Sequence, residues 1–330
     1  MSGDEKRVAS LSTDRRGLDE LRQKYDEIYE SAGVWLYSKS QGIHAVILTQ
    51  LPPDLSGKRV LDVGCGAGRL SIACARRGAA VTGFDFSEPA IRIAALNAAC
   101  SGTEVRFEAR EIEEFCASAT EPFDIVTMVG VLEHVPDPVQ TLGSLNRVVA
   151  PGGLLVTSSP NFVNLRGFSY MTLLTLLDLP MSLADVRQVD YLAMQDWARA
   201  TEWRYDRVVG AIYRFGWGEK AATDMSKRLP LAVRDASLGV PFDYARYDEW
   251  LRRVTTPAEE MLDWLHRADV LHRIPQSELV PMSRAPGIPD GLWSLMQEYM
   301  AEDVTTDPYY CETPPFSTMG GEGIYFLEKQ

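Results

Sequence analysis

Acidic side chains and one histidine of this chain stand where short apolar segments end. Asp62 lies within the ten-residue segment VLDVGCGAGR, Asp85 ends the segment AVTGFD, and Glu133 and His134 follow FDIVTMVGVL. Carboxylates accept hydrogen bonds from hydroxyl and ammonium groups, and a histidine titrates near neutral pH and can act as a general base. The chemistry that these residues offer is recognition of a polar ligand and movement of a proton.

Three glycines follow Asp62 with the spacing G-x-G-x-G, at Gly64, Gly66 and Gly68. A dinucleotide-binding turn has the spacing G-x-G-x-x-G, and its third glycine would fall on Arg69. This difference of one residue favours S-adenosylmethionine over a nicotinamide dinucleotide. Glycine lacks a Cβ, so it permits a sharp turn and a close approach to the ligand, and the helix that follows points free N–H groups toward that ligand.

Each part of this cofactor has candidate contacts. Asp62 can take the ammonium group, and Asp85, 21 residues after Gly64 (85 − 64 = 21), can accept hydrogen bonds from the ribose hydroxyls, as in other doubly wound sheets. We expect the adenine near the ends of the second and third strands and the methionine part at the end of the fourth. The expected cofactor residues are Asp62, Gly64, Cys65, Gly66, Gly68, Asp85, Phe86, Glu111, Ile112, Met128 and Val129.

Apolar and helical segments alternate regularly between residues 58 and 160. Continuous apolar strands that alternate with helices are typical of a parallel sheet covered on both faces, so we predict a doubly wound, mostly parallel α/β fold. The predicted strands are Arg59–Val63, Ala80–Phe84, Glu104–Ala109, Phe123–Val129 and Gly153–Ser159, and the predicted helices are Leu70–Arg77, Pro89–Ala99 and Pro138–Val149.

The rest of the chain has a different organisation. The aromatic-rich part after Pro160 is interpreted as mostly helical, Thr256–Glu259 (TPAE) resembles a capping box that begins a helix, and Gly323–Lys329 is a predicted final strand. We therefore predict four parts: an N-terminal helical cap at 1–57, a cofactor-binding core at 58–160, a helical lid or substrate insertion at 161–254, and a completion of the core at 255–330. We expect Tyr25, Tyr29, Trp35 and Tyr37 to close over the cofactor.

The motifs between residues 58 and 160 occur in the order and spacing of a known family. The run VLDVGCGAGRLS…VTGFDFS…FDIVTMVGVLEHVPDP…LNRVVAPGGLLVTSSPN resembles the class I S-adenosylmethionine-dependent methyltransferases. This resemblance implies a Rossmann-like sheet of seven strands with the last strand antiparallel, here with a helical insertion after strand five. It also implies cofactor contacts at Asp62, Gly64, Gly66, Asp85 and the backbone near 111–112 and 128–129.

Within that superfamily, the run LEHVPDP is most similar to ubiquinone-pathway O-methyltransferases. Those enzymes hold a divalent metal with Glu-x-x-Glu-His, whereas here Gly130 stands at the first position before Glu133 and His134. Because one carboxylate ligand is missing, we predict no metal site. Three roles remain open for Glu133 and His134, namely general base, metal ligand and a structural pair next to the helix after strand four. We name both as the candidate catalytic residues.

Composition restricts the partners of the chain. The formal net charge of −13 opposes binding to a phosphate backbone, so no nucleic acid is expected. The five cysteines include no C-x-x-C pair and the N-terminus has no apolar leader, which favours a reducing cytoplasm. Met171–Leu179 is apolar and is interpreted as a buried lid helix, with contact to a lipid-like substrate or a bilayer surface as the alternative.

The expected function is methylation of a small molecule, on oxygen, with the acceptor bound under residues 161–254. The alternatives are C- or N-methylation of a prenylated or lipid-like metabolite, a non-catalytic regulatory protein that binds the cofactor, and a nicotinamide-dependent oxidoreductase. Positioning of the acceptor and removal of its proton are what the protein must supply. The oligomeric state is open, with a homodimer among the options.

Overall fold

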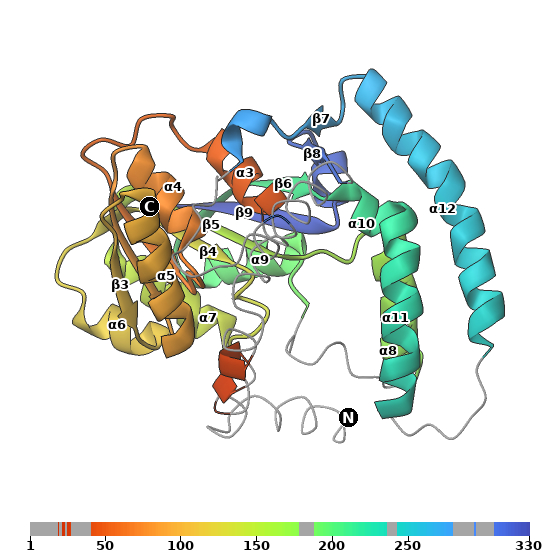
Figure 1. Ribbon diagram of the computed structural model, residues 1–330, viewed down its shortest axis with the longest axis horizontal. Coiled ribbons are helices and arrows are strands. Elements are labelled where there is room, and N and C mark those ends of the chain that lie inside the picture. Colours follow the sequence, from red (N-terminus) through yellow and green to blue (C-terminus); the bar gives the residue numbers. More distant parts are fainter. Residues whose placement is uncertain are drawn as a thin grey trace.

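One mixed sheet forms the centre of the protein. The computed structural model describes residues 19, 22–23, 25–27, 41–177, 188–235, 243–279, 294 and 307–330. Within these residues nine strands form a sheet with the order β3-β2-β1-β4-β5-β9-β6-β8-β7 (Figure 1). Their bounds are β1 (Arg59–Val63), β2 (Ala80–Asp85), β3 (Arg106–Ala109), β4 (Phe123–Val129), β5 (Val149–Pro160), β6 (Trp203–Ala211), β7 (His272–Arg273), β8 (Tyr309–Cys311) and β9 (Glu322–Lys329).

The pairing confirms the predicted fold class. Strands β1 to β5 pair in parallel, and β9 pairs antiparallel with both β5 and β6. The carboxyl ends of β1, β2 and β4 therefore meet at one edge, where Asp62, Asp85 and His134 were expected to gather. The sheet has nine strands in the described residues and not the seven expected, because β8 and β7 extend it beyond β6. These two strands have three and two residues, too few for a recognisable alternation of side chains.

A strand also lies inside the range interpreted as helical. β6 has nine residues and pairs along its length with β9, more than a hundred residues further along the chain. Its aromatic residues Trp203 and Tyr205 alternate with charged ones, as they do in a strand. The helical interpretation of 161–254 is thus wrong for Trp203–Ala211, because the partner that makes this segment a strand is distant in sequence.

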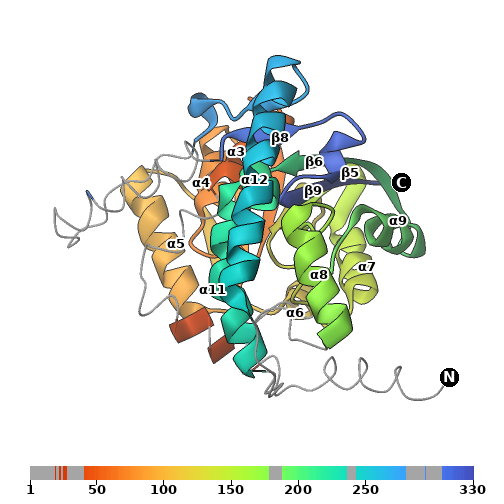
Figure 2. The same ribbon diagram turned by 90° about the vertical axis from the view of Figure 1, so that its right-hand side faces the viewer.

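Helices cover both faces of the sheet (Figure 2). They are α3 (Gln41–Gln50), α4 (Arg69–Arg76) and α5 (Glu88–Ser101) on one face, and α6 (Ile112–Ser118), α7 (Pro138–Val148) and α9 (Tyr191–Ala200) on the other. Successive residues of β1 face opposite ways, so Val60 belongs to the core shared with α3 and α4, and Leu61 to the core shared with α6 and α7. One hydrophobic core covers each face of the sheet. The edge at the carboxyl ends of the parallel strands is left for the functional site.

A group of helices packs at the far end of the sheet from β3. It contains α8 (Leu165–Leu177), α10 (Tyr213–Trp217), α11 (Glu219–Asp235) and α12 (Tyr244–Arg267), and the single turns η2 (Gln276–Glu278) and η3 (Phe316–Thr318) lie near β7 and β8. Leu165–Leu177 contains the first part of the predicted apolar helix Met171–Leu179, whose last two residues lie outside the described residues. In the described part of the chain, no helix has the length and apolar character needed to cross a membrane.

The predicted helix start at Thr256–Glu259 is wrong. Helix α12 begins at Tyr244, where the Asp243 side chain accepts a hydrogen bond from the Arg246 N–H, and it continues through Pro257. A proline inside a helix removes one backbone hydrogen bond. Packing outweighs this loss, because the buried side chains of α12 lie on one face that extends across the proline. Leu251 packs against α11, and Leu262 and Leu265 pack against α10 and β8.

Candidate cofactor and active site

The glycine-rich segment forms the predicted turn between β1 and α4. Gly64, Gly66 and Gly68 have φ angles of 63°, 51° and 78°, a region that residues with a Cβ rarely adopt. The Cys65 N–H donates to the Phe84 carbonyl at 3.0 Å, and the Gly68 N–H donates to the Cys65 carbonyl at 2.9 Å. These bonds hold the turn against the end of β2, and the free N–H groups of the first turn of α4 follow directly.

A side chain at Gly64 would collide with the loop after β4. A Cβ placed there would lie 2.4 Å from Cγ2 of Val131. The turn therefore passes so close to this loop that only glycine fits, which leaves the backbone bare where a cofactor is expected to lie. This close approach is the first sign that the residues present suit the predicted cofactor.

We expect Gly64→Ala to lower the free energy of unfolding by about 2–5 kcal/mol, because positive φ costs about 1–2 kcal/mol and overpacking adds about 1–3 kcal/mol. Urea unfolding measures this change. Gly57→Ala is the matched control, since Gly57 has φ 76° and a Cβ placed there would have no neighbour within 4 Å. The contact explanation fails if the two variants lose equal stability, or if adding Val131→Ala to Gly64→Ala recovers nothing.

Asp62 connects three elements beneath the turn. Its side chain is buried, Oδ2 accepts from Ser71 Oγ at 2.5 Å, and Oδ1 accepts from Thr127 Oγ1 at 2.7 Å. Burial raises the pKa of this carboxyl above its usual value. Each carboxylate oxygen has a second lone pair, so the predicted contact with an ammonium group is compatible with these bonds. What the structure adds is that Asp62 joins β1 to α4 and β4.

Asp85 lies at the end of β2, beside the turn. Its Oδ2 accepts from the Gly66 N–H at 3.0 Å, and its Oδ1 accepts from the Ser87 N–H at 2.9 Å. Burial raises the pKa of Asp85 to about 6, and the two backbone hydrogen bonds oppose that rise. The carboxylate is thus held in one orientation between the glycine turn and the start of α5, as a ribose-binding residue requires.

Three described residues of the N-terminal region lie over this part of the site. Asp26 accepts a hydrogen bond from Ser87 Oγ at 2.5 Å, and Arg22 pairs with Glu111. The Arg22 guanidinium lies 5.9 Å from the centre of the Phe86 ring, and the Tyr25 ring meets Phe86 edge-on at 5.7 Å. The expectation that aromatic residues approach from the N-terminal side agrees with the position of Tyr25. Tyr29, Trp35 and Tyr37 lie outside the described residues.

Glu133 and His134 follow β4 and are linked to β5. Glu133 is buried, and its Oε2 accepts from Ser159 Oγ at 2.7 Å. The Nε2 atom of His134 lies 3.9 Å from Glu133 Oε1 and 3.2 Å from the Tyr25 hydroxyl. A general base needs a partner that orients it and contact with a hydroxyl group. Here Glu133 is fixed beside the His134 imidazole, and the Tyr25 hydroxyl reaches that imidazole. This arrangement equally stabilises the loop after β4.

Gly130 stands where the metal motif has its first carboxylate. Gly130 has φ 65°, and a Cβ there would lie 3.7 Å from Glu133 Oε1. For the residues described here, no three or more His, Cys, Asp or Glu side chains are grouped so that they could hold a metal ion.

The remaining predicted residues contribute in different ways. Met128 is fully buried in the core shared with α6 and α7, so only its backbone borders the carboxyl edge. Ile112 begins α6 and is half-buried, and Val129 ends β4 with partial exposure. Burial raises the pKa of the Cys65 thiol well above its usual value, which leaves this thiol protonated.

Sequence reasoning missed the polar partners that hold the site residues. Ser71 and Thr127 bind Asp62, Ser159 binds Glu133, and Ser87 joins Asp26. Only Ser87 carried a signal, because it is the N-cap of α5, accepts from the Ala90 N–H and precedes a proline in the first turn. The others are ordinary strand and helix residues until the fold brings them to an acid.

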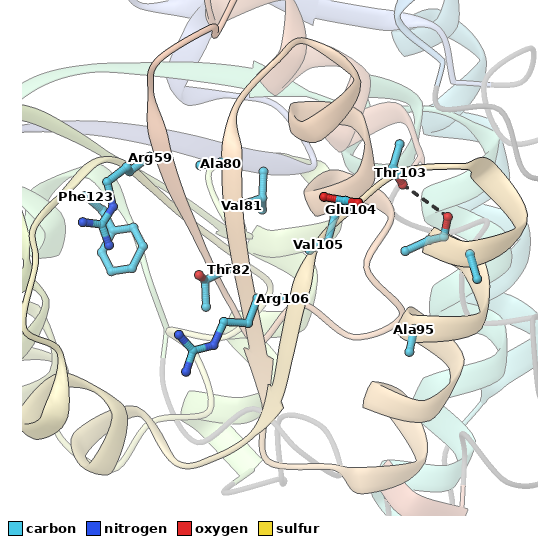
Figure 3. A pocket seen from close by; sticks show the side chains of 12 residues that line it. Arg59, Ala80, Val81, Thr82, Ala95, Thr103, Glu104, Val105, Arg106 and Phe123 are labelled. Atoms are coloured by element: carbon cyan, nitrogen blue, oxygen red, sulfur yellow. Dashed lines mark hydrogen bonds between the residues drawn. The ribbon is translucent and has the colours of Figure 1, made fainter.

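A separate cavity of about 650 Å³ lies at the opposite end of the strands (Figure 3). It is lined by the first residues of three parallel strands, Arg59, Ala80 and Arg106, together with alanines of α5 such as Ala95. Since the glycine turn and Asp85 lie where these strands end, this cavity is not part of the candidate site.

The order of the strands and the glycine turn define a Rossmann-like fold, and the comparison with protein families adds the activity. A family model described as "Methyltransferase domain" matches residues 54–222, about half of the chain. The chain belongs to this family, the class I S-adenosylmethionine-dependent methyltransferases, as its motifs predicted.

Individual relatives are similar over part of the chain. A ubiquinone biosynthesis O-methyltransferase of Aromatoleum aromaticum is 48% identical over 107 residues, which cover 32% of this chain and 46% of that protein. One of Azotobacter vinelandii is 37% identical over 166 residues, 48% of this chain and 70% of that protein. The chain thus spans slightly less than half the length of the first of these relatives. A solved 1,6-didemethyltoxoflavin-N1-methyltransferase of Burkholderia thailandensis is 19% identical, with a TM-score of 0.46, over 59% of this chain and 82% of that chain.

Proposed function

We propose that this protein transfers a methyl group from S-adenosylmethionine to an oxygen atom of a small molecule. The observation that carries the proposal is the common edge of the sheet, which brings the Asp85-anchored glycine turn and the Glu133–His134 pair together. The names of the relatives, which are O-methyltransferases, support oxygen as the acceptor atom. The net charge of −13 supports a small molecule over a nucleic acid as the acceptor.

The residues of the turn suit the cofactor. Gly64 leaves bare backbone, Asp85 offers carboxylate oxygens to the ribose, and Phe86 and Glu111 lie where the adenine is expected. Asp62, buried below, offers negative charge to the ammonium group. When bound, S-adenosylmethionine supplies a methyl group on a positively charged sulfur, which a nucleophile attacks in line.

His134 is proposed to accept the proton of the acceptor hydroxyl at Nε2. This proton would leave the oxygen as the oxygen takes the methyl group, so the methylated product would be a neutral ether. The Tyr25 hydroxyl at 3.2 Å supports the role, because it occupies the position that an acceptor hydroxyl would need. Glu133, held by Ser159, lies with its Oε1 3.9 Å from Nε2 of the imidazole and helps to orient the ring.

The acceptor is proposed to lie between this edge and the helices that follow β5. Ligands of open α/β sheets bind beyond the carboxyl ends of the strands, and β5 continues at its carboxyl end into Asn161 and α8. Asn164 donates to the carbonyls of Asn161 and Gly320, which fixes the path of the chain between sheet and helix. We also propose a cytoplasmic location, because all five cysteines are free.

Methyl-labelled cofactor tests the proposal directly. We expect label to enter hydroxylated acceptors from a panel that also contains amines and activated carbon acids, and mass fragmentation of the product should place the methyl group on oxygen. Label on nitrogen or carbon would replace the O-methylation proposal by one of those reactions. Cofactor binding without label in any compound of a cell extract would favour a regulatory protein, and failure to bind S-adenosylhomocysteine would end the proposal altogether.

A further inference from the structure

Helix α12 presents large apolar side chains to solvent along the outside of the molecule. It lies along α11 on the side away from the sheet, at the edge of the molecule in one view and nearest the viewer in the other (Figures 1 and 2). Trp250, Met261 and Trp264 are 48%, 37% and 58% exposed, although the opposite face of the same helix is buried. Tryptophan and methionine are enriched at protein interfaces, so this face resembles a contact surface.

The exposed apolar residues lie in one line along the helix. Trp250, Pro257 and Trp264 are spaced by seven residues (257 − 250 = 7 and 264 − 257 = 7), close to two helical turns, and Met261 lies one turn after Pro257. All four are exposed. We call them the apolar stripe. Pro257 is at the centre of the stripe, and the two tryptophans lie at equal distances before and after it along the helix.

Exposed charges of alternating sign border the stripe on one side. From Glu249 onward they are Glu249, Arg253, Glu260 and Arg267, which we call the charged flank, and the exposed Arg246 precedes them in the first turn of the helix. Among the described residues, none of the four forms an ion pair, whereas Arg252 on the same helix pairs with Asp248. The other side of the stripe turns toward the buried residues Leu251 and Leu262. Only the charged flank is therefore available to a partner.

When two copies of α12 run antiparallel, the order of the charges on one copy brings opposite charges of the two copies close together. When two copies of α12 cross antiparallel with Pro257 at the centre, residue n lies opposite residue 514 − n. Arg253 then lies opposite position 261, one residue from Glu260 of the partner subunit, and Glu249 lies opposite position 265, two residues from Arg267 of the partner subunit. One or two residues correspond to about 1.5–3 Å along the axis, which long side chains bridge easily.

The same arrangement places the two tryptophans of one copy against those of the other. Trp250 lies opposite Trp264 of the partner subunit, so two aromatic pairs flank the central prolines. A parallel pair would set the charged flank against the side of the helix that is already buried. A bilayer surface suits the helix less well, since interfacial helices carry mainly basic residues on their polar face, and this flank is half acidic in a chain of net charge −13.

We propose that α12 is a self-association surface: two copies of this protein pair their α12 helices antiparallel about Pro257, through the apolar stripe and two sets of Arg253–Glu260 and Glu249–Arg267 ion pairs. The proposal is independent of the reaction. A contact of one helix per subunit is small, so the dimer dissociates on dilution, with a dissociation constant in the micromolar range of roughly 1–100 µM.

Sedimentation velocity of the full chain at concentrations from about 1 to 200 µM tests the proposal, chosen to span that range. We expect the mass to rise from 36.7 kDa toward twice this value. Arg253→Glu and Glu260→Arg should each weaken association about tenfold or more, because each sets like charges against one another, and the double variant should recover wild-type association to within about threefold. Trp264→Ser should also weaken it. Arg199→Glu, at an exposed position of α9, is the control that should leave it unchanged.

Each other outcome overturns the proposal. A wild-type protein that stays monomeric throughout, or a dimer that ignores all α12 substitutions, excludes α12 as the surface. Two charge variants whose effects simply add exclude the antiparallel register. The last measurement is flotation with vesicles of phosphatidylcholine and phosphatidylglycerol. If the monomeric protein binds these vesicles and Trp264→Ser abolishes that binding, the surface is a bilayer contact instead. Circular dichroism checks that each variant is folded.

Discussion

Asp85→Ala is expected to lower the affinity for S-adenosylhomocysteine by about 10²–10⁴-fold, since two hydrogen bonds to a charged acceptor contribute about 1.5–3 kcal/mol each. The carboxylate is held by the Gly66 and Ser87 N–H groups in the orientation proposed for the ribose. Its removal loses the ribose contacts and also releases the glycine turn. Isothermal titration calorimetry with S-adenosylhomocysteine measures the loss.

A second aspartate provides the matched control. Asp124 also accepts a backbone hydrogen bond, from the Arg59 N–H at 2.8 Å, but it lies where β4 begins, at the opposite end of the sheet. Asp124→Ala should lower stability and leave cofactor affinity unchanged. Equal affinities for the wild type and Asp85→Ala would show that the ribose is not bound here.

The same carboxyl predicts a pH dependence of binding. Burial raises the pKa of Asp85 from 3.8 to about 6, and ribose hydroxyls donate to the ionised form. Affinity should therefore fall about tenfold per pH unit below pH 6 and level off above about pH 7. For folding, the raised pKa has the opposite consequence: the contribution of Asp85 to stability is present below about pH 4 and is lost as the pH rises through 6. Asp85→Asn should remove both effects, and constant affinity between about pH 5 and 7 would contradict the assignment.

His134→Ala is expected to lower kcat by about 10²–10⁴-fold, the usual contribution of a general base, with little change in S-adenosylhomocysteine affinity. The imidazole is within reach of a hydroxyl group and beside a buried carboxylate, and its hydrogen bond to Tyr25 lies apart from the bonds that hold the glycine turn. Steady-state rates with an accepted hydroxylated substrate measure the loss. Added imidazole should restore part of the rate, because it can take the place of the missing base.

Two further variants separate this role from a structural one. His266 Nδ1 donates to the Leu271 carbonyl at 2.8 Å, within the turn that ends α12, so His266→Ala should leave kcat unchanged. If His134 only stabilises the loop after β4, then His134→Ala will lower the free energy of unfolding and the cofactor affinity together, and imidazole will restore nothing. Glu133→Gln should show a smaller loss of kcat than His134→Ala, since Glu133 acts through the imidazole.

Local patterns predicted the first half of the fold well. The predicted strands from Arg59 to Val129 agree with β1 to β4 to within two residues at each end, and Ser87 and Asp137 cap helices that were predicted to begin beside them. These elements depend on apolar runs, glycines and caps that lie within a few residues of one another. The elements that were missed depend on distant partners. β6 pairs with β9, and α12 packs on α11, so the short alternation at Trp203–Tyr205 and the cap at Asp243 were too weak to establish these elements without their partners.

The sequence by itself determined the class of protein and predicted where its cofactor binds. The spacing of Gly64, Gly66 and Gly68 and the acid at Asp85 are local facts, because turn geometry depends on neighbouring residues. Only the tertiary structure decided what surrounds them. Tyr25 reaches His134 across 109 residues, and Trp250 and Trp264 are exposed because α12 turns its other face to α10, α11 and β8. Such contacts depend on how the elements pack, and packing is set by the whole chain at once.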